Sequence, residues 1–172
     1  MAHDESHVLR VLRIAKFIAE REGANVEVVL KAAELHDIAR NSENHAFESA
    51  RIAEKILRDQ GYDDKFIEAV KHAIEAHSFS GKIEAKTLEA KVLSDADKLD
   101  AIGAIGIARA FMFSGEKGRS IEETLKHFED KLLKLVDNLY TDTAKRIAKK
   151  RHEFLKTFYD EIKKEMAFQD LQ

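Results

Sequence analysis

The sequence predicts an all-α protein, a single-domain helical bundle, and three observations support this. The 172 residues include no Pro and only seven Gly, so the residues that most often interrupt helices are scarce. Apolar residues recur at helical spacing through nearly the whole chain, and no segment alternates with a period of two. The length suits one domain.

Seven helices are predicted, and most of them are bounded by a Gly, an Asn or a polar turn. They cover approximately residues 8–23, 26–37, 44–61, 63–77, 91–111, 121–140 and 143–172. Either Asn41 or Asn44 is expected to cap the third helix. Residues 78–86 and 114–120 are the predicted loop and turn around the fifth helix. We therefore expect one domain over 1–172, with a core over about 1–113 and C-terminal helices over about 120–172.

Composition narrows the classes of function. The absence of Cys excludes disulfides, thiolate zinc sites and Cys nucleophiles. A formal net charge of −3 provides no bulk basic field for nucleic acid, so no nucleic-acid partner is expected. Charges scattered through the N-terminal segment are untypical of a signal peptide or a membrane anchor. The expectation is a cytoplasmic protein with no membrane partner.

His36 and Asp37 form the central chemical signal, at the end of the apolar run AAELHDIAR. Imidazole and carboxylate groups are good ligands for divalent ions. Adjacent residues on a helix point about 100° apart, so both side chains can approach one ion. Further ligands must then come from other helices, and the candidates are His7, His45, His77, Asp95, Asp97 and Asp100.

These motifs together resemble the HD superfamily of metal-dependent phosphohydrolases. The matching segments are HVLRV, LHDIA, HAFESA, IEAHS and DADKLDAIGAIGIAR, which run in the family order H…HD…H…H…D. The long last segment is similar to a branch of small bacterial and archaeal HD hydrolases. HFEDKLLKL and RIAKKRHEFL, nearer the C-terminus, resemble the same branch. Single motifs are common, whereas the ordered set is specific.

The resemblance implies a metal site made by His7, His36, Asp37 and Asp97. It would hold a divalent ion such as Mn, Mg, Co, Ni, Fe or Zn. Asp97 is preferred because Ala-Asp-x-Leu is the usual family pattern. Asp95 is the rival: the two carboxylates lie about 200° apart on a helix, so at most one faces the ion, and helical phase does not choose between them.

Four further side chains are candidates for roles beside the metal site, two from the resemblance and two from their charge. His45 and His77 match positions where some HD proteins bind a second metal, and they could instead contact substrate phosphate. Lys98 and Arg109 are candidates for offsetting phosphate charge.

Other polar and small residues receive structural roles. His3, His72, His127 and His152 are interpreted as ordinary surface or partly buried histidines, although His3 lies four residues before His7. Asp100 is expected to cap or pair within the bundle. Gly103 and Gly106 weaken a helix and are expected to permit close helix packing. The basic final helix is interpreted as a solvated face, with a homodimer surface as the alternative.

The predicted activity is metal-dependent hydrolysis of a small phosphorylated metabolite, most plausibly a nucleotide. Relatives in this branch suggest nucleoside triphosphate pyrophosphohydrolysis ahead of phosphatase activity. Two alternatives remain open: a di-iron HD-type oxygenase and a non-catalytic ligand-binding HD module. Iron content and oxygen-dependent turnover would distinguish the oxygenase from the hydrolase.

Overall fold

The computed structural model describes residues 5–78 and 83–171. These residues form helices and contain no strand, which confirms the all-α prediction. In chain order the elements are α1 (Glu5–Glu22), α2 (Val26–Leu35), α3 (His45–Asp59), α4 (Asp64–Glu75), α5 (Leu88–Asp100), α6 (Gly103–Glu116), α7 (Ile121–Asp130), the 3₁₀ helix η1 (Leu132–Asn138), α8 (Asp142–Met166) and the 3₁₀ helix η2 (Gln169–Leu171).

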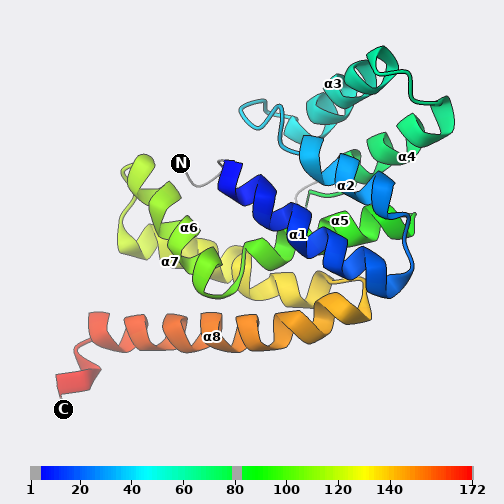
Figure 1. The fold of residues 1–172 in the computed structure, drawn as a ribbon. Helices are drawn as coiled ribbons and strands as arrows, with labels where there is room; N and C mark the ends of the chain where they lie inside the picture. The colour runs from blue at the N-terminus through cyan, green and yellow to red at the C-terminus, as the bar shows by residue number, and fades with distance from the viewer. Residues whose placement is uncertain (1–4, 79–82, 172) are drawn as a thin grey trace.

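Helices α1 and α5 pack against each other near the middle of the bundle (Figure 1). Helix α2 contacts both of them, and α3 and α4 form a hairpin at one end. The long helix α8 runs along the opposite side, where it contacts α5 and α6. The core is apolar and includes the fully buried Val11, Ile18, Leu93 and Leu99. The central pair therefore provides a rigid base on which the other helices are placed.

Five helix starts are fixed by a side chain that accepts a hydrogen bond from a first-turn amide, which satisfies a group the helix leaves unpaired. These N-caps are Asn25, Asp63, Thr87, Ser120 and Thr141. Helix α3 begins differently. Asn44 occupies the N-cap position, as one of the two predicted alternatives, but its side chain makes no cap hydrogen bond.

The predicted helix over 91–111 is two helices, α5 and α6, with a break after Asp100. Gly103 has a φ of +72°, a left-handed conformation that side chains disfavour, and it turns the chain. A Cβ on Gly106 would lie 2.2 Å from the carbonyl oxygen of Ala101, so only Gly allows this close fold-back. Gly103 permits close helix packing against Arg151 of α8, whereas Gly106 packs against its own preceding turn.

The predicted helix over 121–140 is also interrupted, at Lys131, whose φ and ψ are −133° and −63°. Beyond it the chain continues as the 3₁₀ helix η1. Leu132 and Leu135 are both buried, and their spacing of three residues matches the 3₁₀ repeat. Tertiary burial therefore overrides the strong helical pattern of this segment.

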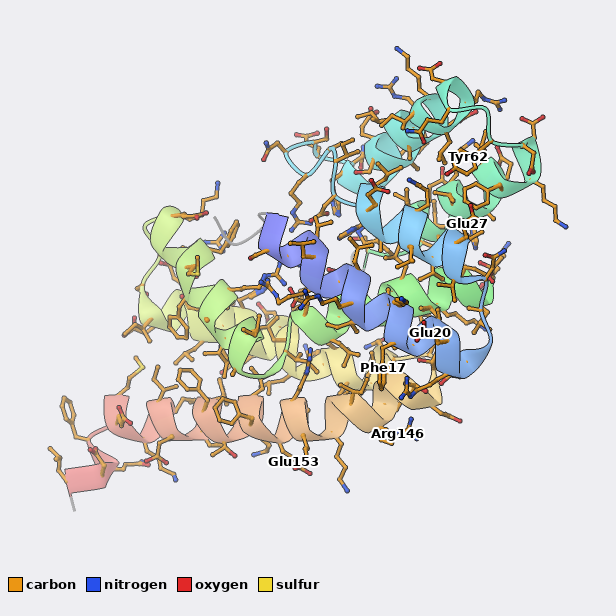
Figure 2. All side chains as sticks on the ribbon, viewed as in Figure 1. Phe17, Glu20, Glu27, Tyr62, Arg146 and Glu153 are labelled. Atoms are coloured by element: carbon orange, nitrogen blue, oxygen red, sulfur yellow. The ribbon has the colours of Figure 1, made fainter. Side chains whose placement is uncertain are left out.

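The last predicted helix ends at Met166 rather than continuing to the C-terminus. Most of its exposed residues are polar, with Phe154 and Met166 as exposed apolar side chains, and Figure 2 shows the exposed Arg146 and Glu153. Over residues 5–78 and 83–171, no helix combines the length and the apolar character that crossing a membrane requires.

Substitution of Gly106 tests the fold-back between α5 and α6. We expect Gly106→Ala to lower the free energy of unfolding by about 1–3 kcal/mol, because a backbone carbonyl must move to accommodate the methyl group. Gly115→Ala is the matched control on the same helix, since nothing lies within 4 Å of its Cβ position. It should raise stability by up to about 1 kcal/mol. Urea denaturation of both variants would measure this, and equal stabilities would contradict it.

Candidate metal centre

Helices from distant parts of the chain bring six predicted site residues to one region. His7 of α1 and Asp97 of α5 lie within helices, and the other four lie at helix ends. His36 is the C-cap of α2 and Asp37 follows it in a turn. The remaining two are His45, the first residue of α3, and His77, which lies just after α4. Helix ends suit ligands because the chain turns there and side chains can converge.

His7, His36 and Asp37 form one group of candidate ligands whose atoms all lie within 4.8 Å of one another. His7 Nε2 lies 3.4 Å from His36 Nε2 and 3.5 Å from Asp37 Oδ2. His36 Nε2 lies 3.9 Å from the same carboxylate oxygen. Ligands about 2.1 Å from one divalent ion are separated by about 3–3.4 Å, so this spacing is close to that of a coordination shell.

A second group overlaps the first. Asp37, His45 and His77 also offer ligand atoms within 4.8 Å of one another. Asp37 belongs to both groups, and the imidazole rings form a continuous row. The ring centroids of His36 and His77 are 5.1 Å apart, and those of His77 and His45 are 5.5 Å apart. The donors therefore suit one ion, or two ions that share the Asp37 carboxylate.

Backbone carbonyls orient two of the imidazoles. The Nδ1 of His36 is 2.8 Å from the carbonyl oxygen of Ala33, and the Nδ1 of His77 contacts that of Ile74. An Nδ1–H that donates to a carbonyl leaves Nε2 with a lone pair for an ion. Burial, reinforced by the neighbouring His36, lowers the pKa of His77 to about 4, so this ring is neutral near pH 7. Both rings are therefore ready to coordinate a cation.

A buried carboxylate orients the third imidazole. Asp100 Oδ2 lies 2.8 Å from His7 Nδ1, which leaves His7 Nε2 directed at Asp37 and Asp97. Asp100 also accepts hydrogen bonds from Arg10 and Arg109, at 2.6 and 2.7 Å. The structure thus agrees with the expectation that Asp100 pairs within the bundle. Its role is to support a candidate ligand.

The contacts around Asp100 and His7 shift the pKa values of both side chains. Burial alone would raise the pKa of Asp100, but hydrogen bonds from His7 and Arg10 and the charge of Arg109 hold it well below its ordinary value. For His7, burial lowers the pKa, while Asp100, Asp37 and Asp97 together raise it above the ordinary value. The carboxylates around His7 therefore favour positive charge at this position, whether a proton or a metal ion carries it.

The two rival aspartates occupy different environments. Asp97 Oδ1 lies 3.5 Å from His7 Nε2, and its side chain is 29% exposed. Asp95 is fully buried on the other side of α5, where it accepts the amide hydrogens of Tyr140 and Thr141 and the Thr141 hydroxyl. Asp97 belongs to neither group of three, but it borders them, whereas Asp95 anchors the start of α8.

The six predicted site residues His7, His36, Asp37, His45, His77 and Asp97 form a cage, and a cavity of about 220 Å³ opens beside it. Three of the predicted residues, His45, His77 and Asp97, line it, together with Arg109. Basic side chains that the sequence analysis did not assign to the site line it as well: Arg40, Arg119, His127 and Lys131. His127 and Lys131 both lie in HFEDKLLKL, the segment that resembles the HD branch, whereas nothing local in the sequence marks Arg40 or Arg119.

Lys98 does not line this cavity, which corrects the expectation that it offsets phosphate charge there. Its ammonium group is buried, donates a 2.8 Å hydrogen bond to Ser94 and lies 4.7 Å from the Tyr140 ring centre. The reason is helical phase: Lys98 follows Asp97 by one residue and therefore points to a different side of α5.

The four histidines that were given no role in the site lie in different places in the structure, except His3, which is not described. His72 accepts a hydrogen bond from the amide of Lys86, and His152 is partly buried on α8. His127 lines the cavity, so its interpretation as an ordinary surface residue is incomplete. His3 lies outside the described residues.

Comparison with known proteins identifies the family of this chain. The family model described as HD domain matches residues 5–102, which include the six predicted cage residues. An uncharacterized protein of Bacillus subtilis, YpgQ, is 38% identical, and the match covers 95% of this chain and 84% of YpgQ.

Solved structures give the same result. The crystal structure of Bacillus subtilis YpgQ in complex with ADP is 37% identical, with a TM-score of 0.81, covering 95% of this chain and 90% of that one. An HD-superfamily hydrolase from Bacillus thuringiensis is 34% identical, with a TM-score of 0.76, covering 96% and 87% of the two chains.

Paired substitutions would separate the roles of the two aspartates. We expect Asp97→Asn to weaken Mn²⁺ binding by more than about tenfold, since it removes a charge beside His7. Asp95→Asn should retain the metal but lose about 1–3 kcal/mol of stability, because three donors share that carboxylate. Calorimetric titration with Mn²⁺ and urea denaturation would measure these effects. The reverse pattern would make Asp95 the ligand.

Proposed function

We propose, because the chain belongs to the HD-domain family, that it is a metal-dependent phosphohydrolase acting on a nucleotide. The observation that carries the proposal is the position of the cage. Two overlapping ligand groups share Asp37, and two members of the second group, His45 and His77, line a cavity that basic side chains also line. Such a cavity fits an anion at the same place where a divalent ion would be held.

The donor set fits a hard or borderline divalent ion. His7, His36 and Asp37 would hold it, with Asp97 beside them. When bound, the ion lowers the pKa of a water molecule and polarises a phosphoryl oxygen. A second ion would use Asp37, His45 and His77; with a single ion, the two histidines would contact phosphate instead.

Arg109 is the proposed group for neutralising the negative charge of the substrate phosphates. Arg109 lines the cavity while it donates to Asp100, so its position is fixed by the same carboxylate that orients His7. Its guanidinium would offset the charge that builds on phosphate oxygens during attack. Rigid placement of this kind lowers the barrier because little rearrangement is needed as charge develops.

A nucleoside triphosphate is the proposed substrate. YpgQ, which shares the fold and 37% of its aligned residues, has been crystallised with ADP. In the proposed reaction, water oxygen bonds to the α-phosphorus and the bond from that phosphorus to the bridging oxygen breaks. The bridging oxygen leaves with pyrophosphate, the nucleoside monophosphate keeps the water oxygen, and the protons of water pass to solvent and product oxygens.

Metal-dependent turnover tests the proposal. We expect metal-stripped protein reloaded with Mn²⁺, Mg²⁺, Co²⁺ or Ni²⁺ to release pyrophosphate or phosphate from nucleoside triphosphates. Asp37→Ala should reduce the rate by at least about a thousandfold, because it removes the carboxylate common to both ligand groups. Asp59→Ala is the matched control, an exposed aspartate at the end of α3, and should retain full activity.

The product identifies the bond that is broken, since pyrophosphate indicates attack at the α-phosphorus and phosphate indicates cleavage from the end. Stoichiometric metal binding without turnover of any nucleotide would contradict the hydrolase. Oxygen consumption by iron-loaded protein would then favour the oxygenase, and its absence a non-catalytic ligand-binding role.

A further inference from the structure

The cavity extends from the cage to a basic cluster that residues beyond the matched HD segment supply. We infer that Arg119, His127 and Lys131, here called the polyphosphate subsite, bind the substrate phosphates that leave as pyrophosphate. This inference rests on the proposed function and deepens it, because it assigns selectivity for di- and triphosphates over monophosphates to the C-terminal part of the chain.

The subsite residues form a path from the interior to the surface. Asp97 and Arg109 line the cavity too, and the Arg109 side chain is only 11% exposed. Lys131 is partly buried, whereas His127 and Arg119 are exposed. A linear chain of phosphates with one end at the cage and the other toward solvent would lie among these groups.

Local structure fixes the three residues. A reciprocal capping box between Ser120 and Glu123 sets the first turn of α7. His127 and Lys131 follow one helical turn apart, and the Lys131 amide donates to the His127 carbonyl at 3.0 Å. The Arg119 amide donates to the carbonyl of Ser114, a further cavity residue, at 2.9 Å. His127 near the end of α7 and Lys131 just after it therefore line the same cavity, and Arg119, in the turn before α7, lines it as well.

The cluster concentrates positive charge. Burial, and then the charges of Lys131 and Arg119, lower the pKa of His127. The cationic side chains that line the cavity, Arg40, Arg109, Arg119 and Lys131, repel one another, and the carboxylate of Asp97 offsets part of this repulsion. A polyphosphate carries several negative charges along a short chain and would relieve this repulsion, whereas a monophosphate held at the cage would reach little of it.

The surroundings of Phe113 favour phosphate groups over a nucleobase in this part of the cavity. Arg119 lies 5.4 Å from the centre of the Phe113 ring, and Lys117 lies 5.7 Å from it. Cations therefore already occupy the space over this ring. A nucleobase stacked there would have to displace them.

Binding of inorganic pyrophosphate and orthophosphate tests the subsite without requiring turnover. Calorimetric titrations would use Mg²⁺-loaded protein with the same Mg²⁺ concentration in cell and syringe. We expect Lys131→Met to weaken pyrophosphate binding by about tenfold or more and orthophosphate binding by less than about twofold. Lys134→Met, an exposed lysine one turn along η1 that does not line the cavity, is the matched control and should bind both like the wild type.

A second variant covers the case in which Lys131→Met misfolds. Arg119 is exposed, so Arg119→Gln should fold normally and weaken pyrophosphate binding by about threefold or more. Equal pyrophosphate affinity in Arg119→Gln, Lys131→Met and Lys134→Met would overturn the subsite, as would equal weakening of both probes by Lys131→Met. If the selective loss occurs but no nucleotide is hydrolysed, the proposed function fails while the subsite stands.

Discussion

The buried carboxylate of Asp100 is the interaction on which the site depends. It joins α1 to α5 through His7 and Arg10, and it reaches α6 through Arg109. A carboxylate that is 1% exposed is costly unless it is paired, and removal of a partner from such a network typically costs about 3–5 kcal/mol. Helix packing, imidazole orientation and the placement of a cavity arginine are therefore coupled through one side chain.

This coupling explains why the break between α5 and α6 matters for function. A continuous helix over 91–111 would carry Arg109 away from Asp100 along the helix axis. The left-handed turn at Gly103 and the close approach permitted by Gly106 instead fold α6 back, so that Arg109 reaches the Asp100 carboxylate at 2.7 Å. The glycines thus serve the geometry of the site as well as helix packing.

The molecule combines an HD segment with later helices that complete its cavity. The matched residues 5–102 supply the candidate metal ligands, while Arg119, His127 and Lys131 come from the following region. In the proposed function, the first part of the chain would carry the catalytic metal site and the following part would select the substrate. Such a division allows the cage to stay constant while the neighbouring helices adapt the cavity to different phosphorylated ligands.

The sequence by itself determined the helical class, because helical periodicity is a local property. The resemblance of its ordered motifs to the HD superfamily grouped His7, His36 and Asp37, and the structure places their ligand atoms together. The family pattern favoured Asp97 over Asp95 but helical phase did not decide between them, since that depends on which face of α5 meets α1 and which meets Thr141 in the tertiary structure. Likewise, the interruption at Lys131 and the basic wall of the cavity arise from packing between distant segments. Burial energy decided them, and no local pattern records it.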